Sequence, residues 1–80
     1  MSKSIYGPEQ ESLQFILHEA RNEAKLTQAQ LADKMGVPQS FVSKYESGER
    51  RLDLVELRTV CLAIDLPLIA LIRRWEKALK

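Results

Sequence analysis

The sequence predicts an all-α fold, in which two short helices near the middle of the chain are joined by a tight turn. Three observations indicate that central pair. Thr27 and Gln30 match a capping box, which starts a helix near Gln28. Gly36 ends that helix, because glycine adopts a left-handed backbone at little cost. Pro38 then marks the start of the second helix, since the fixed φ of proline suits a first helical position.

Apolar spacing gives each central helix a buried side. Leu31, Ala32 and Met35 form one apolar stripe on the first helix. The small side chain of Ala32 allows a second helix to cross closely there. On the second helix, Val42 and Tyr45 fall on the side that we expect to face the core.

The other side of the second helix is polar, with Phe41 at its border. At about 100° per residue, five polar residues fall on one arc of this helix. Such side chains hydrogen-bond base edges: glutamine fits adenine, lysine reaches guanine or a phosphate, and serine serves several bases. The arc consists of Gln39, Ser40, Ser43, Lys44 and Ser47.

The first helix of the chain is predicted from Gly7 and Pro8 to about Ala24, with acidic residues in its first turn. Phe15 projects from nearly the opposite side to the core, so something else must cover it. The expected core face follows the helical period. It comprises Leu13, Ile16, Leu17, Ala20 and Ala24.

Two more helices complete the chain. Asp53 and Glu56 form a second capping pattern, and the helix that follows is expected to direct Leu54, Leu57, Cys61 and Ile64 inward. Asp65, Leu66 and Pro67 break it, and a last helix covers about residues 68–79. This last helix has one broad apolar face. Its apolar residues are Leu68, Leu71, Ile72, Trp75, Ala78 and Leu79.

The length, net charge and residue composition of the chain limit the classes of function that it can have. With 80 residues and a net charge of +1, we expect one small domain over residues 1–80 whose overall charge does not by itself indicate nucleic-acid binding. Residues 34–51 carry four basic and two acidic side chains and are the most positive segment. The lone Cys61 favours a core thiol over a redox sensor, and the lone His18 makes a metal site improbable on spacing grounds. The longest apolar run, 66–72, is too short to span a membrane, and the N-terminus has no signal segment, so a cytoplasmic protein is expected.

The run LTQAQLADKMGVPQSFVSKYESGER resembles the Cro and repressor type of helix-turn-helix, the XRE-like family. The similarity covers about residues 13–71, with the motif at about 27–47. It implies a compact five-helix, lambda-repressor-like domain whose third helix enters the major groove of double-stranded DNA. Pro38 is a departure, because family members often carry a capping serine or threonine there.

The resemblance also implies roles for individual residues. Arg21 and Glu46 match positions that often form an ion pair between the first and third helices; the alternative is that both are ordinary solvated charges. We favour the pair, because Glu46 falls on the core side of its helix. By the same resemblance, bases would be read by Gln39, Ser40, Ser43 and Lys44, and phosphates held by Gln28, Ser47 and Arg50 or Arg51.

The C-terminal part of the last helix extends past the point where the family fold usually needs it. Trp75, Ala78 and Leu79 could pack back on Phe15 or form a two-fold interface with a second copy. We favour the dimer, because large aromatic side chains are enriched at interface centres and a palindromic site calls for two reading helices.

The leading functional hypothesis is a sequence-specific, double-stranded DNA-binding transcriptional regulator, bacterial or phage-encoded, which acts as a homodimer on an operator. The alternative is an antitoxin that binds a toxin partner and regulates its own promoter. An enzyme is the least favoured interpretation, because the sequence has no nucleophile and base constellation, no phosphate-binding glycine loop and no metal-ligand spacing. No cofactor is expected.

Overall fold

The computed structural model describes residues 7–80, and this part of the chain folds into five helices. Residues 1–6, which the sequence analysis places within the single predicted domain, lie outside the described residues. The helices are α1 (Pro8–Glu23), α2 (Gln28–Met35), α3 (Gln39–Ser47), α4 (Leu54–Ala63) and α5 (Leu68–Ala78). The all-α prediction and its five segments are therefore confirmed.

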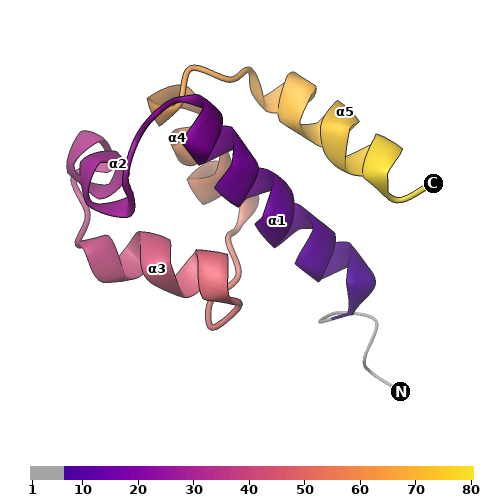
Figure 1. Ribbon diagram of the computed structural model, residues 1–80, viewed down its shortest axis with the longest axis horizontal. Coiled ribbons are helices and arrows are strands. Elements are labelled where there is room, and N and C mark those ends of the chain that lie inside the picture. The colour runs from indigo at the N-terminus through magenta and orange to yellow at the C-terminus, as the bar shows by residue number, and fades with distance from the viewer. Residues whose placement is uncertain (1–6) are drawn as a thin grey trace.

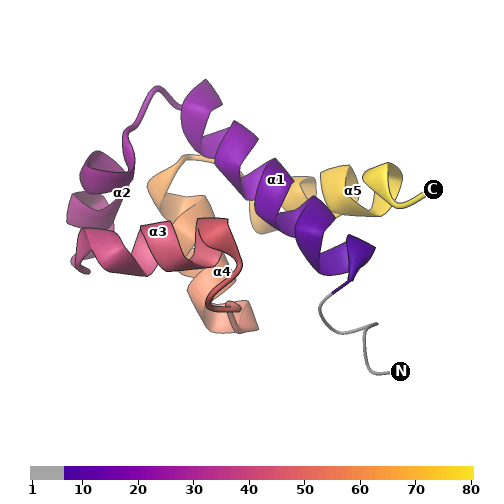
Figure 2. The ribbon, with the colours of Figure 1, turned by 60° about the horizontal axis from the view of Figure 1, so that its bottom comes forward.

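The helices form two groups around a shared centre. Figure 1 shows α2 and α3 together at one end of the molecule and α1 and α5 side by side at the other, with α4 behind them. Figure 2, turned by 60°, keeps the same separation. Helix α1 also contacts α3, and α4 contacts both α2 and α5. The long helix α1 and the helix α4 thus connect the helix-turn-helix pair to α5.

The central turn forms as its residues predict. Thr27 and Gln30 make a reciprocal capping box: the Gln30 backbone N–H donates to Thr27 Oγ1 at 3.0 Å, and the Thr27 N–H donates to Gln30 Oε1 at 2.9 Å. Gly36 ends α2 in the left-handed region with φ +72°. The following N–H, of Val37, donates to Ala32 O at 3.0 Å, so the carbonyls at the end of α2 are satisfied within the turn.

Gly36 provides a test of this turn. We expect Gly36→Ala to lower the free energy of unfolding by about 1–2 kcal/mol, the cost of a left-handed backbone for a residue with a Cβ. No atom lies within 4 Å of the added Cβ, so the cost is confined to the backbone. Urea unfolding followed by circular dichroism measures it. Gly36→Asn, which tolerates this region better, is the matched control, and equal stability of all three proteins would contradict the explanation.

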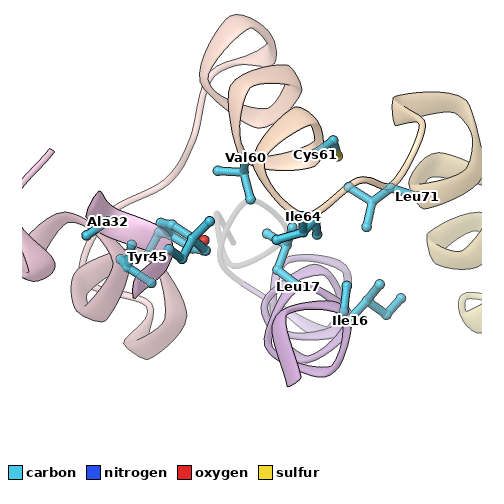
Figure 3. Packing of buried hydrophobic residues seen from close by; sticks show 11 residues of the cluster. Ile16, Leu17, Ala32, Tyr45, Val60, Cys61, Ile64 and Leu71 are labelled. Atoms are coloured by element: carbon cyan, nitrogen blue, oxygen red, sulfur yellow. The ribbon is translucent and has the colours of Figure 1, made fainter. Parts of the chain in front are cut away.

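All five helices contribute to one hydrophobic core. Figure 3 shows Ile16 and Leu17 of α1 beside Leu71 of α5 and beside Ile64, the residue that follows α4. Ala32 of α2 and Tyr45 of α3 lie on the other side of Val60. Cys61 is buried among them, as predicted, and burial raises the pKa of its thiol. Helix α3 therefore packs against the core through Val42 and Tyr45, which are 0% and 2% exposed.

One predicted core position is wrong. Leu54 was expected to face inward from the helix that Asp53 begins, but it is 65% exposed. The capping box is present, with the Glu56 N–H donating to Asp53 Oδ1 at 2.7 Å. The capping box fixes where α4 begins but not which of its residues the fold covers, so Leu54 at the first helical position remains largely in solvent. Phe15 is also exposed, at 60%, and no described residue covers it fully.

Candidate nucleic-acid interface

The polar arc of α3 lies on the solvent side of the helix. Four of its five members are exposed and Ser43 is half-buried, whereas Val42 and Tyr45 on the opposite side are buried. The hydroxyl of Ser47 donates to the Lys44 carbonyl at 3.1 Å, which keeps Ser47 close to its own helix. The polar side of α3 therefore presents hydrogen-bond donors and acceptors to solvent, while the opposite side of this short helix packs against the core.

Pro38 does not change the position at which α3 begins. It occupies the position before the first helical residue with φ −67° and ψ 153°, an extended conformation that proline and capping residues share. It makes no side-chain capping hydrogen bond, but its carbonyl accepts from the Phe41 N–H at 3.0 Å. Helix α3 consequently begins at Gln39, so the first turn carries Gln39 and Ser40 outward.

Glu46 ties α3 to the helices behind it. The structure places the predicted partners Arg21 and Glu46 in contact: Arg21 Nε donates to Glu46 Oε2 at 2.7 Å and Nη2 donates to Oε1 at 3.0 Å. Both side chains are nearly buried, with 8% and 5% exposure. Gln28, at the start of α2, donates from Nε2 to Glu46 Oε1 at 3.1 Å. A single carboxylate thus joins α1, α2 and α3.

The ionised forms of Glu46 and Arg21 are stabilised by the hydrogen bonds around them. Burial alone would raise the pKa of the Glu46 carboxyl, but the hydrogen bonds from Arg21, His18 and Gln28 outweigh it and hold that pKa below its usual value. The hydrogen bond to Glu46 raises the pKa of the Arg21 guanidinium. Arg21 also donates from Nη1 to the Leu26 carbonyl at 2.8 Å, which anchors the connection between α1 and α2.

His18 is a further member of this network that the sequence analysis did not identify. Its Nδ1 lies 3.0 Å from Glu46 Oε1 and its Nε2 lies 3.1 Å from Asn22 Nδ2. The Arg21 Nη2 atom also lies 3.2 Å from His18 Nδ1, so the His18 ring contacts both members of the Arg21 to Glu46 pair. The spacing of His18, Arg21 and Asn22, three and four residues apart on one helix face, is the signal that could have indicated the cluster.

The predicted phosphate-binding residues have different surroundings. The amide nitrogen of Gln28 already bonds Glu46, and Arg51 is exposed after α3. Arg50 is only partly exposed, because its guanidinium forms two hydrogen bonds with Glu56 on α4, at 3.0 and 2.7 Å. These bonds are the largest cause that lowers the pKa of Glu56 to about 2, and they raise the pKa of Arg50.

The predicted interface on α5 is partly used within the chain. The Trp75 indole N–H donates to the Glu9 carbonyl at 2.9 Å, and Trp75 packs against the core from a half-buried position. Leu79 is half-buried, whereas Ala78 is exposed and lines an open groove of about 380 Å³ between α1 and α5. Phe15 lines the same groove. The hydrogen bond therefore ties Trp75 to α1 at Glu9, while packing on Phe15 and the two-fold interface both stay predictions.

Among residues 7–80, no three His, Cys, Asp or Glu side chains form a group that could hold a metal ion. None of the five helices has the length and apolar character needed to cross a membrane.

Comparison with known proteins connects this geometry to a family. A helix-turn-helix family model (HTH_3) matches residues 17–71, which include the whole of α2, α3 and α4. No curated protein sequence matches the chain.

Several solved structures are similar over nearly the whole chain. An XRE-family like protein from Pseudomonas syringae pv. tomato is 42% identical, with a TM-score of 0.87, over 96% of this chain and 94% of that chain. A mutant of the restriction-modification controller protein C.Esp1396I is 22% identical, with a TM-score of 0.83, over 90% and 97%. The clp gene regulator ClgR from Corynebacterium glutamicum is 20% identical, with a TM-score of 0.79, over 91% and 78%. The last two similarities indicate the fold.

Proposed function

Because the chain belongs to the XRE-type helix-turn-helix family of non-enzymatic DNA-binding domains, we propose that it is a sequence-specific regulator of transcription that binds double-stranded DNA as a homodimer. We further propose that residues 1–80 act as one unit in the cytoplasm, on an operator with two half-sites. The observation that carries the proposal is the exposed polar arc of α3, held rigidly from behind by Val42, Tyr45 and the Arg21 to Glu46 pair.

The roles proposed for the arc follow from its chemistry. Gln39, at the first position of α3, can bond both N6 and N7 of adenine, and Lys44 can reach guanine O6 and N7. Ser40 and Ser43 can donate to or accept from several base edges. Ser47 and Arg51 lie towards the end of α3 and beyond it, where contacts to phosphate would fix the register of the helix in the groove. Gln28 keeps a second amide hydrogen for a phosphate while the first bonds Glu46.

Selection of bound duplexes from a random pool tests the function. We expect one preferred sequence made of two inverted half-sites about 10 base pairs apart, the spacing of successive major grooves on one side of the duplex. Binding is then measured by fluorescence anisotropy on the selected duplex and on a scrambled one. Equal affinity for both duplexes would contradict sequence-specific binding.

We propose that the dimer forms around the α1 and α5 groove, where Ala78 and the 60% exposed Phe15 are open. Trp75 is a poor probe, because its substitution also removes the hydrogen bond to Glu9. Phe15→Ser is expected to raise the dimer dissociation constant about tenfold or more, with thermal stability of the monomer unchanged. Sedimentation velocity over a concentration series measures this.

The matched control for that variant is Leu62→Ser, which removes an apolar side chain that is 63% exposed on α4. We expect it to leave the association unchanged. If Leu62→Ser weakens the dimer and Phe15→Ser does not, the interface lies on α4 and the groove is excluded.

A second candidate function, an antitoxin that binds a toxin, draws on the exposed apolar side chains of α4 and the start of α5. Val55, Leu62 and Ile69 are 75%, 63% and 64% exposed. Exposed large apolar side chains on small domains can serve protein contacts. The toxin hypothesis requires a toxin gene next to this one and a stable complex when the two proteins are produced together. If neither the neighbouring toxin gene nor the complex is found, the antitoxin hypothesis is rejected and the transcriptional regulator is the remaining candidate function.

A further inference from the structure

Arg50 stands between the first turns of α3 and α4. Its guanidinium carbon lies 4.5 Å from the centre of the Phe41 ring on α3, in cation–π contact, while its two terminal nitrogens bond the two carboxylate oxygens of Glu56 on α4. Arg50 Nη1 also donates to the Arg51 carbonyl at 3.3 Å, and the Arg50 backbone N–H donates to the Lys44 carbonyl at 3.2 Å. One side chain therefore links the start of α3, the loop after it and the start of α4.

Both ends of this link are themselves fixed. Phe41 meets the buried Tyr45 edge to face, with ring centres 5.9 Å apart and planes at 78°. Glu56 accepts from the Asp53 N–H at 3.0 Å, as part of the capping box that starts α4. The chain of contacts runs from the core through Phe41 and Arg50 to the α4 terminus. It sets how the first turn of α3 sits, the turn that carries Gln39 and Ser40.

The same contacts make Arg50 a poor ligand for phosphate. A phosphate that approached the guanidinium would also approach the Glu56 carboxylate, whose oxygens lie 2.7 and 3.0 Å from the guanidinium nitrogens. The negative charge of Glu56 cancels the charge of Arg50 at that place. A phosphate could take the place of Glu56 on the two terminal nitrogens only if the two-point pair were broken.

We propose that Arg50 is a positioning residue, which locks the first turn of the reading helix α3 against α4, and that it does not hold a phosphate. The inference rests on the proposed DNA-binding function and corrects the role that the family resemblance implied for this residue. Lysine cannot replace Arg50 in this role, since an ammonium has no planar fork to match the carboxylate and to stack on the ring.

The salt dependence of DNA binding separates the two roles. A protein that loses one phosphate contact loses about 0.9 in the slope of log K against log salt concentration. For Arg50→Ala we expect an unchanged slope and unchanged affinity for scrambled duplex, together with about tenfold or greater loss of affinity for the selected duplex. A slope reduced by about 0.9, with equal loss on both duplexes, would overturn the proposal.

Two further variants decide the matter even if Arg50→Ala folds poorly. Glu56→Gln keeps every positive charge and can keep the capping box, because glutamine serves at that position, but it removes the charged partner of Arg50. We expect it to lose affinity for the selected duplex as Arg50→Ala does. Arg50→Lys keeps the charge and is expected to show the same loss.

Opposite results in these variants count against the proposal. Wild-type specific binding in Arg50→Lys, or stronger binding in Glu56→Gln, would mean that Arg50 acts as a positive charge towards DNA. The proposed sequence-specific function fails on its own if the wild-type chain shows no preferred duplex. In that case the slope of log K against log salt concentration on the scrambled duplex still reports whether Arg50 contacts a phosphate. A wild-type chain that binds no DNA at all would overturn both.

Discussion

Replacing Glu46 with alanine is expected to lower the free energy of unfolding by about 3–5 kcal/mol, the largest effect of any single substitution considered for this protein. The reason is the group left behind. Arg21 is 7% exposed, so without Glu46 its positive charge would stay buried without a carboxylate partner. The polar groups left near its guanidinium would be the Leu26 carbonyl, the Asn22 side chain and the His18 ring. Urea unfolding followed by circular dichroism at neutral pH gives the value.

Matched variants separate burial from charge. Glu23→Ala removes a carboxylate that also forms a two-point pair, with Arg74, but there the side chains are 63% and 33% exposed. We expect it to cost about 0–1 kcal/mol, as exposed pairs do. The double variant Arg21→Met with Glu46→Leu should recover much of the loss, because an apolar pair leaves no unpaired charge. Equal losses in Glu46→Ala and Glu23→Ala would contradict the burial argument.

The lowered pKa of Glu46 gives this stabilisation a definite pH dependence. Its folded pKa lies below that of an unfolded glutamate, about 4.3, so the folded state binds its proton less readily. The contribution is complete above about pH 4.3 and is lost as the pH falls through the lowered folded value. The stability difference between wild type and Glu46→Gln should therefore shrink in acid, and a difference that grows on acidification would contradict it.

The second large effect concerns recognition. Replacing Gln39, Ser40, Ser43 and Lys44 together with alanine is expected to reduce binding of the selected duplex to the level of scrambled duplex, a loss of about 10³-fold or more. Each well-made contact to a base edge contributes about 1–3 kcal/mol of discrimination. Stability should change little, because three of the four side chains are exposed and none belongs to the core. Fluorescence anisotropy on the two duplexes measures the loss.

A charge control accompanies that variant. Arg73→Ala removes one positive charge, as Lys44→Ala does, but from an exposed position on α5, which Figure 1 shows at the far side of the molecule from α3. We expect Arg73→Ala to bind the selected duplex as the wild type does. If the quadruple variant still distinguishes the two duplexes, the surface that reads DNA lies elsewhere on the protein.

What the sequence by itself determined is the local structure. The ends of α2 and the start of α4 follow from interactions within four residues, the capping boxes at Thr27 and Asp53 and the left-handed turn at Gly36. The buried side of α3 follows from the period of the helix, which places Val42 and Tyr45 together. Such features depend on near neighbours in the chain, so a single sequence is enough to predict them. The base-reading roles of the polar arc remain predictions.

The tertiary structure decided which partner each side chain meets across the fold. The helical period placed Leu54 inward, but the packing of α4 leaves this first helical residue in solvent. The family resemblance implied a phosphate contact for Arg50, and the loop after α3 places its guanidinium on Phe41 and Glu56. The joining of α1, α2 and α3 on Glu46 likewise depends on how the helices cross. A helical wheel describes directions around one axis, and only the packed helices set the distances between axes.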